Sequence, residues 1–311
     1  MEIKKIDTRQ LNDTNGHSRP DSFATFIGQS QIKKILKTAI GSAQKRQGNL
    51  GHVLFAGPSG FGKTTMATII SKEMSVGVKM VTAYAISKPS EIVSILNSLE
   101  SGDILFIDEI HRLKPMIEEV LYIAMEDFVI DMVMPEGGSV RIPINPFTLI
   151  GATTKSEMLS QPMKNRFVYS FHFMEYTFEE KQIIIERYLD FYQIPFESDI
   201  LQAIAHKVDS VPREIHTICI KIRDFCVNHG YSKLTNEIWL EFLHHSQIKE
   251  GGMTPLHQQY LDVLAHYDRP LGSKAIAAQL GVNEKALEED IEPLLLKLGK
   301  IEKTHAGRVL L

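Results

Sequence analysis

The sequence predicts an α/β fold with a doubly wound parallel sheet, followed by a small helical domain and a C-terminal winged-helix domain. Three observations predict it. Apolar strand-like runs alternate with segments of helical spacing up to about residue 176. The chain then has helical spacing throughout, to about Ser246. The segment from Thr254 has the order helix, helix, GVN turn, helix and two-stranded wing.

Composition limits the class of protein. A chain of 311 residues with 43% hydrophobic and 23% charged residues is typical of a soluble protein with about two or three domains. No apolar run is long enough to span a membrane, and the N-terminus lacks the apolar core of a signal peptide. Cys219 and Cys226 are too few for a disulfide framework and lack metal spacing. We therefore expect a cytoplasmic protein with two buried thiols and no membrane partner.

A glycine-rich loop is the strongest local motif. Residues 57–64, GPSGFGKT, match the pattern G-x-x-x-x-G-K-[ST], with an apolar strand before them and helical spacing after them. Backbone N–H groups turned inward at Gly57, Gly60 and Gly62 would cradle phosphate oxygens, and the helix N-terminus adds positive potential. Lys63 is expected on the β- and γ-phosphates and Thr64 on Mg²⁺. A glycine-rich turn with an incidental lysine is the alternative, and the flanking strand and helix disfavour it.

A second motif, DILFIDEIHRL, ends a buried strand in two carboxylates. Ile104 to Ile107 form a continuous apolar run, and Asp108 and Glu109 follow. Charged groups at the end of a buried strand are costly unless they have partners. Asp108 can bind the water shell of Mg²⁺, and Glu109 can polarise the water that attacks the γ-phosphate. An exposed pair of turn carboxylates is the alternative.

Two further polar residues are ambiguous on spacing alone. The buried strand FTLIGA, residues 147–152, ends in Thr153 and Thr154. Thr154 can hydrogen-bond the lytic water or the γ-phosphate, although spacing favours a threonine that caps a turn. Arg166, in KNRF, has the character of a solvated surface charge.

Other segments complete the predicted first domain, residues 1–176. Helices are expected from Ser30 to Ala43 and after Ser90, which can cap the second one. A strand is expected near Met80 to Ala83. The β-rich segments on either side of PEGG predict a β-hairpin inserted at about residues 128–145. This hairpin is a candidate surface for docking a partner, and packing on its own domain is an equally good interpretation.

The remaining chain predicts two smaller domains, residues 177–249 and 250–311. Thr177 and Glu180 form a capping box, and Arg213 lies just inside a predicted helix start. The net charge is −4, so any contact with nucleic acid needs a local basic patch. The predicted recognition helix is too acidic to lie against phosphates. The wing, with Lys303 and Arg308, is the basic part of this segment.

Taken together, several motifs resemble one family. The stretches RPDSFATFIGQ, GPSGFGKTT, GDILFIDEIHRL, EEVLYIAMEDF, PFTLIGATT, NRF and VPREI occur in this order with family-like spacing. From about Arg19 to its end, the chain resembles the RuvB family of bacterial Holliday-junction branch-migration ATPases, of the AAA+ class. The resemblance implies an AAA+ P-loop core, a helical lid and a winged-helix domain. It also implies a DNA-dependent ATP hydrolase that forms hexameric rings on duplex DNA and is docked on the junction by RuvA.

The resemblance also implies roles for individual residues. Asp108 and Thr64 are similar to the Mg²⁺ ligands, Glu109 to the catalytic base and Thr154 to the first sensor. Arg213 resembles the second sensor, and Arg166 resembles an arginine finger that acts on a neighbour's nucleotide. The hairpin corresponds to the surface that grips RuvA. The wing residues Lys303 and Arg308 match DNA contacts. The residues that match the nucleotide site are Arg19, Gly57, Gly60, Gly62, Lys63, Thr64, Thr65, Glu126, Asp127, Phe128, Arg166, Tyr176 and Arg213.

The chain also departs from the family pattern. GPSG replaces GPPG, PMKNRF replaces LRDRF, the hairpin is a few residues shorter, and the wing KTHAGR lacks two of three arginines. The main hypothesis is an ATP-driven translocase for branch migration in recombination and repair. The weakened wing and short hairpin motivate an alternative, a divergent paralogue that acts as an ATP-dependent adaptor on DNA. A clamp-loader-like protein or a protein remodeller is a third possibility, which the winged helix and the IDEIHRL–AMEDF pair disfavour.

Overall fold

The computed structural model describes residues 19–133, 139–248, 250–267 and 269–311. Contacts between Cα atoms divide the chain into two compact units. One holds the described residues up to Glu180 together with Val211–Arg213, and the other holds Lys181–Ser210 and Glu214–Leu311. The three-domain division at residues 176 and 249 stays a prediction.

The first unit alternates strands and helices along the chain. Its helices are α1 (Ser30–Lys45), α2 (Lys63–Met74), α3 (Pro89–Asn97), α4 (Pro115–Asp127) and α5 (Gln161–Arg166). Its short helical turns are η2 (Ala83–Ala85), η3 (Ile110–Arg112) and η4 (Ser156–Met158). Its strands are β1 (Val53–Ala56), β2 (Val78–Thr82), β3 (Ile104–Asp108), β4 (Val129–Val133), β5 (Ser139–Pro143), β6 (Thr148–Thr153) and β7 (Tyr169–His172).

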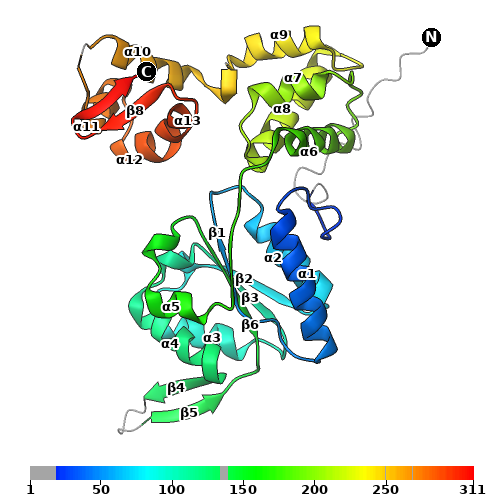
Figure 1. Ribbon diagram of the computed structural model, residues 1–311, viewed down its shortest axis with the longest axis vertical. Coiled ribbons are helices and arrows are strands. Elements are labelled where there is room, and N and C mark those ends of the chain that lie inside the picture. The colour runs from blue at the N-terminus through cyan, green and yellow to red at the C-terminus, as the bar shows by residue number, and fades with distance from the viewer. Residues whose placement is uncertain (1–18, 134–138, 249, 268) are drawn as a thin grey trace. The chain divides into compact units, whose positions relative to one another are not determined.

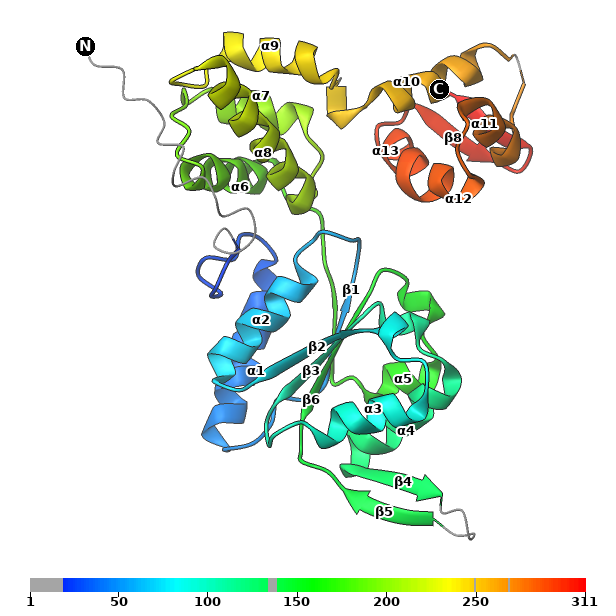
Figure 2. The ribbon, with the colours of Figure 1, turned by 180° about the vertical axis from the view of Figure 1, so that it is seen from behind.

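A parallel sheet with the order β2-β3-β6-β1-β7 lies at the centre of this unit. Figures 1 and 2 show α1 and α2 on one face of the sheet and α3, α4 and α5 on the other. Helices on both faces explain why β1 and β6 are buried along their whole length. The predicted α/β fold is therefore confirmed.

The core on the α3–α4 face joins side chains from helices and strands. Ile92 and Leu96 of α3 pack with Leu105 and Ile107 of β3 and with Leu121 of α4. Burying a side chain of this size stabilises the fold by roughly 1.5–3 kcal/mol. The strands that bear the polar loop residues are therefore held by packing on both faces of the sheet.

Two local predictions are wrong in detail. The second strand begins earlier than Met80 and ends at Thr82. Ser90 lies inside α3 and does not cap it, because Pro89 takes the first helical position, where its fixed φ suits the helix. Glu91 caps this end instead, since its carboxylate accepts the backbone N–H groups of Ser87 at 2.6 Å and Lys88 at 3.2 Å.

The predicted hairpin is confirmed as the antiparallel pair β4–β5, which extends from the end of α4 (Figure 1). Ile130 is buried in the core cluster, whereas Val140 is exposed. Arg141 reaches Asp131 across the pair, with Nε 3.1 Å from the carboxylate. Part of the hairpin thus packs on its own domain and part faces outward. The turn residues 134–138 lie outside the described residues.

The second unit contains the predicted helical segment. Its helices are α6 (Phe178–Phe191), α7 (Ile200–Lys207), α8 (Pro212–His229) and α9 (Asn236–Ser246), followed by η5 (Glu250–Gly252). The starts of two of these helices, Phe178–Glu180 of α6 and Pro212–Arg213 of α8, belong to the first unit. The capping box before α6 is confirmed, because Glu180 accepts the Thr177 N–H at 2.9 Å and Thr177 Oγ1 accepts the Glu180 N–H at 3.2 Å. Both thiols are buried and unpaired, and burial raises the pKa of Cys226 to about 11.

The C-terminal segment forms the predicted winged helix. Its elements are α10 (Pro255–Ala265), α11 (Ser273–Leu280), α12 (Glu284–Ala286), the π-helical turn η6 (Leu287–Ile291), α13 (Glu292–Lys297), β8 (Ile301–Thr304) and β9 (Gly307–Leu310). β8 and β9 pair antiparallel to form the wing. Gly307 has φ +139°, and a Cβ there would lie 2.5 Å from the Leu271 carbonyl oxygen, so glycine is required. Among the described residues, no helix is long and apolar enough to cross a bilayer.

His52 joins three elements of the first unit and predicts a pH effect. Its Nδ1 accepts the Leu149 N–H at 2.8 Å, and its Nε2 lies 3.0 Å from the Met125 carbonyl oxygen. Burial lowers the pKa of His52 from its usual value of 6.5. Below about pH 6.5 the unfolded chain takes up a proton that the folded chain excludes. The unfolding free energy therefore decreases as the pH is lowered. Urea titrations should show that the unfolding free energy falls less between pH 7 and pH 5 in His52→Gln than in the parent protein. Equal slopes in both proteins would contradict this assignment.

Candidate functional site

The strand order brings the sequence motifs to one edge of the sheet. The glycine loop follows β1, Thr154 follows β6, and Asp108 ends β3. Since β6 lies between β1 and β3 in a parallel sheet, all three carboxyl ends are neighbours. Ligands of such sheets bind outside the carboxyl ends of the strands. The edge that carries these residues is therefore the candidate site.

The glycine loop has the backbone that a phosphate cradle requires. Gly57, Gly60 and Gly62 have φ values of +137°, +82° and +97°, which side chains strongly disfavour. A Cβ on Gly60 would lie 2.7 Å from Val211 Cγ1, and a Cβ on Gly62 would lie 2.9 Å from the Phe26 ring. The loop leads directly into α2, whose N-terminus favours an anion. Loop and helix together therefore fit a phosphate chain.

Lys63 begins α2 and bends back over the loop. Its Nζ donates to the carbonyl oxygens of Gly57 at 2.6 Å and Pro58 at 2.8 Å. Burial lowers the pKa of Lys63, and the nearby carboxylates of Glu109 and Asp108 oppose that shift. An ammonium group that two neutral carbonyls hold can exchange them for charged phosphate oxygens, which bind a cation more strongly. Thr64 and Thr65 follow on the first turn of α2.

The two carboxylates occupy different backbone positions. Asp108 is the last residue of β3, and its Oδ1 accepts the Glu109 N–H at 3.1 Å. Glu109 has φ +50°, a left-handed conformation that is uncommon outside glycine, asparagine and aspartate. Strained backbone of this kind persists where its surroundings hold it in place, often at functional sites.

Thr154 and His111 hold the Glu109 carboxylate from two sides. Thr154 Oγ1 lies 3.0 Å from Oε2 and 3.2 Å from Oε1 of Glu109, and the Thr154 N–H donates to Oε2 at 3.3 Å. His111 Nδ1 lies 3.1 Å from Glu109 Oε2 and 2.9 Å from Thr153 Oγ1. The structure thus brings Thr154 and Glu109 together. Sequence reasoning missed His111, although its place after the carboxylate pair in IDEIH was visible.

The predicted second sensor also reaches the loop. Arg213 is the second residue of α8, and its Nη1 donates to Ser59 Oγ at 3.0 Å. Tyr176 is buried, and its hydroxyl donates to the Phe61 carbonyl oxygen at 3.1 Å. Both residues therefore border the glycine loop. Arg19 is exposed at the start of the described chain.

Among the described residues, the side-chain contacts of Arg166 are with α4 and not with the glycine loop. Its Nη2 donates to Glu126 Oε2 at 3.0 Å, and its guanidinium lies 5.7 Å from the centroid of the Tyr122 ring. Asp127 Oδ2 lies 3.8 Å from Arg141 Nη1 in the hairpin. Phe128, with φ +52°, ends α4 and packs edge-on against Phe147. Arg166, Glu126, Asp127 and Phe128 thus gather around the end of α4.

In the winged helix, both predicted DNA contacts already pair with acidic groups. The fully buried Glu292 accepts Arg308 Nε at 2.8 Å, Lys303 Nζ at 2.6 Å and the Tyr260 hydroxyl at 3.0 Å. Arg308 Nη2 also lies 2.6 Å from Glu288 Oε1. Burial acts to raise the pKa of Glu292, but the bonds from Arg308 and Lys303 outweigh it and hold the pKa low. The acidic helix thus neutralises part of the wing's positive charge.

Arg308→Ala is expected to destabilise the winged helix by roughly 3 kcal/mol, because it leaves a buried carboxylate short of a partner. Lys303→Ala should cost less, since 42% of the Lys303 side chain is exposed against 15% for Arg308. Amide hydrogen exchange in α13 and β8 measures the loss locally. Equal protection in Arg308→Ala and the parent protein would contradict a structural role for Arg308.

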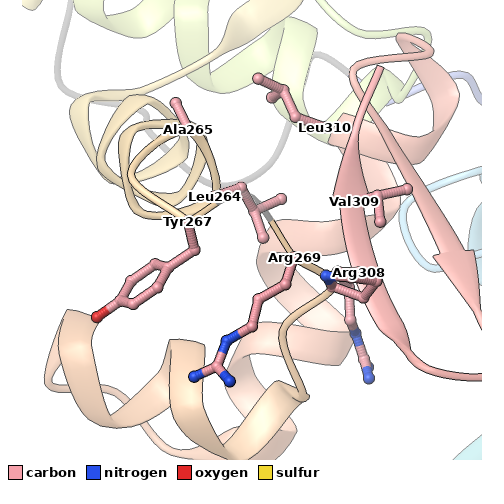
Figure 3. A pocket seen from close by; sticks show the side chains of 8 residues that line it. Leu264, Ala265, Tyr267, Arg269, Arg308, Val309 and Leu310 are labelled. Carbon is pink, nitrogen blue, oxygen red and sulfur yellow. The ribbon is translucent and has the colours of Figure 1, made fainter.

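A pocket of about 300 Å³ lies beside the wing, between α10 and β9 (Figure 3). The guanidinium groups of Arg269 and Arg308 extend to the same side of it. Sequence reasoning did not single out Arg269, which precedes α11 in a segment without a motif. The lining residues are Leu264, Ala265, Tyr267, Arg269, Pro270, Arg308, Val309 and Leu310.

Two known domain families match separate parts of this chain. A family described as "Holliday junction DNA helicase RuvB P-loop domain" matches residues 18–173. A second, described as "RuvB C-terminal winged helix domain", matches residues 250–310. The matched regions contain the glycine loop and the wing respectively.

Individual relatives match over nearly the whole chain. The Holliday junction branch migration complex subunit RuvB of Campylobacter lari is 40% identical, covering 99% of this chain and 93% of the relative. The subunit of the same name from Lactiplantibacillus plantarum is 39% identical, covering 94% and 88%. The solved Thermotoga maritima RuvB Holliday junction branch migration motor is 35% identical, with a TM-score of 0.82 over 94% of this chain and 95% of that chain.

Proposed function

The chain belongs to the RuvB family, and from this premise we propose that it is an ATP-driven DNA translocase that moves the branch points of Holliday junctions. The observation that carries the proposal is the convergence of Lys63, Glu109 and Thr154 at one sheet edge beside a left-handed glycine loop. This arrangement fits phosphoryl transfer from a nucleotide triphosphate to water.

The proposed chemistry assigns one task to each polar residue. The loop N–H groups and Lys63 bind the phosphate chain, and Glu109 takes a proton from the attacking water. Thr154 keeps the Glu109 carboxylate facing that water, as the bonds of 3.0–3.3 Å support. Arg213 binds the γ-phosphate from the same compact unit as the loop. Arg19, Thr65 and Tyr176 complete the nucleotide pocket.

We further propose Mg²⁺ as the companion of ATP, bound by Thr64 and Asp108. Among the described residues, no group of three or more His, Cys, Asp or Glu is placed to hold a metal ion. A nucleotide-bound Mg²⁺ needs only one or two protein ligands, because phosphates and water supply the others. Hydroxyl and carboxylate oxygens after a phosphate loop fit that need. The ion would neutralise charge on the phosphates.

The proposed assembly is a hexameric ring in which Arg166 acts on the neighbour's nucleotide. Its contacts within the chain are with Glu126 and Tyr122 on α4, and an arginine finger is commonly supplied by a second molecule. Glu126, Asp127 and Phe128 would border that nucleotide. The β4–β5 hairpin, with its exposed Val140, is the proposed surface for a RuvA-like junction-binding protein.

For DNA, we propose that Lys303 and Arg308 on the wing contact the phosphate backbone without reading sequence. The division into an ATPase domain of residues 1–176, a lid of 177–249 and a winged helix of 250–311 accompanies this proposal, as does a cytoplasmic location. A divergent adaptor that binds ATP without moving junctions is the second candidate. The pairing of both wing cations with Glu288 and Glu292 favours it, because neutralised cations bind phosphate less strongly.

ATP turnover with and without duplex or four-way junction DNA distinguishes the two candidates, together with strand exchange on a labelled junction. A translocase shows DNA-stimulated turnover and ATP-dependent loss of the junction, and its duplex binding has a steep salt slope. The slope should become shallower in Lys303→Ala. Turnover that ignores DNA, with junctions left intact, would overturn the translocase in favour of the adaptor.

A further inference from the structure

Three side chains of α4 form a row along one face of the helix toward α5. Glu118, Tyr122 and Glu126 are spaced four residues apart, the spacing that aligns side chains on a helix. Their partners outside α4 lie at both ends of α5: Ser160 caps its first turn, and Arg166 is its last residue. One face of α4 thus holds the start and the end of the helix that carries the proposed arginine finger.

At the start of α5, a buried carboxylate gathers two hydroxyl groups. The Tyr122 hydroxyl donates to Glu118 Oε2 at 2.6 Å, and Ser160 Oγ donates to the same oxygen at 2.7 Å. Ser160 Oγ in turn accepts the Met163 N–H at 3.3 Å, which caps α5. Glu118 is only 8% exposed, so it needs both donors. Burial, with the bond to Glu118, also raises the pKa of the Tyr122 hydroxyl.

At the end of α5, the ring of Tyr122 faces the guanidinium of Arg166. The Arg166 guanidinium lies 5.7 Å from the Tyr122 ring centroid, and Arg166 Nη2 donates to Glu126. Arg166 Nε is buried and has no hydrogen-bond partner among the described residues. The guanidinium is therefore fixed by one ion pair and one aromatic face, and part of its hydrogen-bonding capacity is not used within the chain.

The length of α5 makes these contacts decisive. A helix of six residues, Gln161–Arg166, is too short to be stable by itself, so tertiary contacts set its position. A displacement of about 1 Å in a catalytic group can reduce a rate by about a hundredfold. The contacts between α4 and α5 thus decide where the guanidinium is presented.

We propose that Tyr122 is a positioning residue for Arg166, with its hydroxyl fixing the start of α5 through Glu118 and Ser160 and its ring supporting the guanidinium. This inference rests on the proposed role of Arg166 as a finger toward a neighbour's nucleotide. Glu118 and Ser160 take part only through Tyr122 and the α5 cap, and the proposal assigns none of the three a contact with the nucleotide.

The test uses Tyr122→Phe, which keeps the ring and removes the hydroxyl, and Tyr122→Leu, which removes both. We expect kcat for ATP to fall about fivefold to tenfold in Tyr122→Phe and further in Tyr122→Leu, with KM nearly unchanged. Affinity for ADP with aluminium fluoride, which mimics the transferring phosphate, should fall in parallel, and affinity for ADP alone should not. Tyr84→Phe, at an exposed tyrosine in η2, is the matched control and should leave kcat, KM and both affinities unchanged.

The same measurements in an Arg166→Ala background separate positioning from folding. A tyrosine that acts through Arg166 causes no further loss of aluminium-fluoride affinity there, whereas a general effect on the fold lowers it again and overturns the inference. Normal kcat in Tyr122→Phe and Tyr122→Leu, with Arg166→Ala inactive, also overturns it but leaves the proposed function intact. Normal turnover in Arg166→Ala itself would refute the finger, and the positioning role with it.

Discussion

Arg166→Ala is expected to lower ATP turnover by about a thousandfold or more, with ATP binding nearly unchanged. An arginine finger stabilises charge on the transferring phosphoryl group and contributes a factor of about 10³–10⁵ to the rate. Within the chain, Arg166 lies against Glu126 and Tyr122 and is 26% exposed at its side chain, so it is available to another subunit. Turnover under excess ATP and equilibrium binding of a non-hydrolysable analogue measure the two effects.

Mixing two inactive variants tests whether the finger acts across subunits. A site formed by an Arg166→Ala subunit and a Glu109→Gln neighbour has an intact base from the first and an intact finger from the second. Turnover should therefore reappear in the mixture if Arg166 acts in trans. A mixture as inactive as its components would contradict the ring arrangement. Lys164→Ala, which removes another cation from α5, is the matched control and should keep most of the activity.

Glu109→Gln is expected to lower turnover by about a hundredfold to ten-thousandfold, the usual contribution of a general base, while ATP still binds. Glutamine has the shape of glutamate, so its side-chain oxygen can still face the Thr154 hydroxyl. In the parent protein this hydroxyl lies 3.0 Å from Glu109 Oε2. It cannot take up a proton from water. The loss of rate therefore reports proton transfer and not loss of the fold.

Single-turnover kinetics with a stoichiometric amount of ATP measure this loss directly, since product release does not enter. Glu119→Gln is the control, because Glu119 is an exposed carboxylate on α4 next to the buried Glu118. Rapid single turnover in Glu109→Gln would show that another group, or water alone, accepts the proton.

Local motifs predicted much of the candidate site. The glycine loop was recognisable because left-handed backbone at close quarters requires glycine at set intervals, and Gly57, Gly60 and Gly62 have it. Glu109 was recognisable because a carboxylate at the end of an apolar strand is unusual. The spacing alone left the position of Thr154 ambiguous, and its hydrogen bonds to Glu109 show that it lies at the candidate site. The roles of these residues in turnover remain for the variants above to test.

Other features depended on contacts between distant parts of the chain. His111 lies beside Glu109 and Thr153 because the turn after β3 folds against the end of β6. Glu118 and Ser160, 42 residues apart, meet because α5 packs on α4. The acidic character of the helical segment at residues 284–292 predicted repulsion from DNA. Two of these carboxylates instead pair with the wing of their own domain: Glu292 holds Lys303 and Arg308, and Glu288 holds Arg308.

The sequence by itself determined the parallel α/β core, the glycine loop, the carboxylate pair, the hairpin and the winged helix, because periodicity, turn chemistry and motif spacing act over short stretches of chain. Only the tertiary structure decided which partners the charged side chains have. A buried or half-buried charge is stabilised by whatever opposite charge or hydrogen-bond donor the fold brings near it, and strand order and helix packing set that choice. Arg166 against α4 and Arg308 against Glu292 were therefore invisible in the sequence and are decided by the fold.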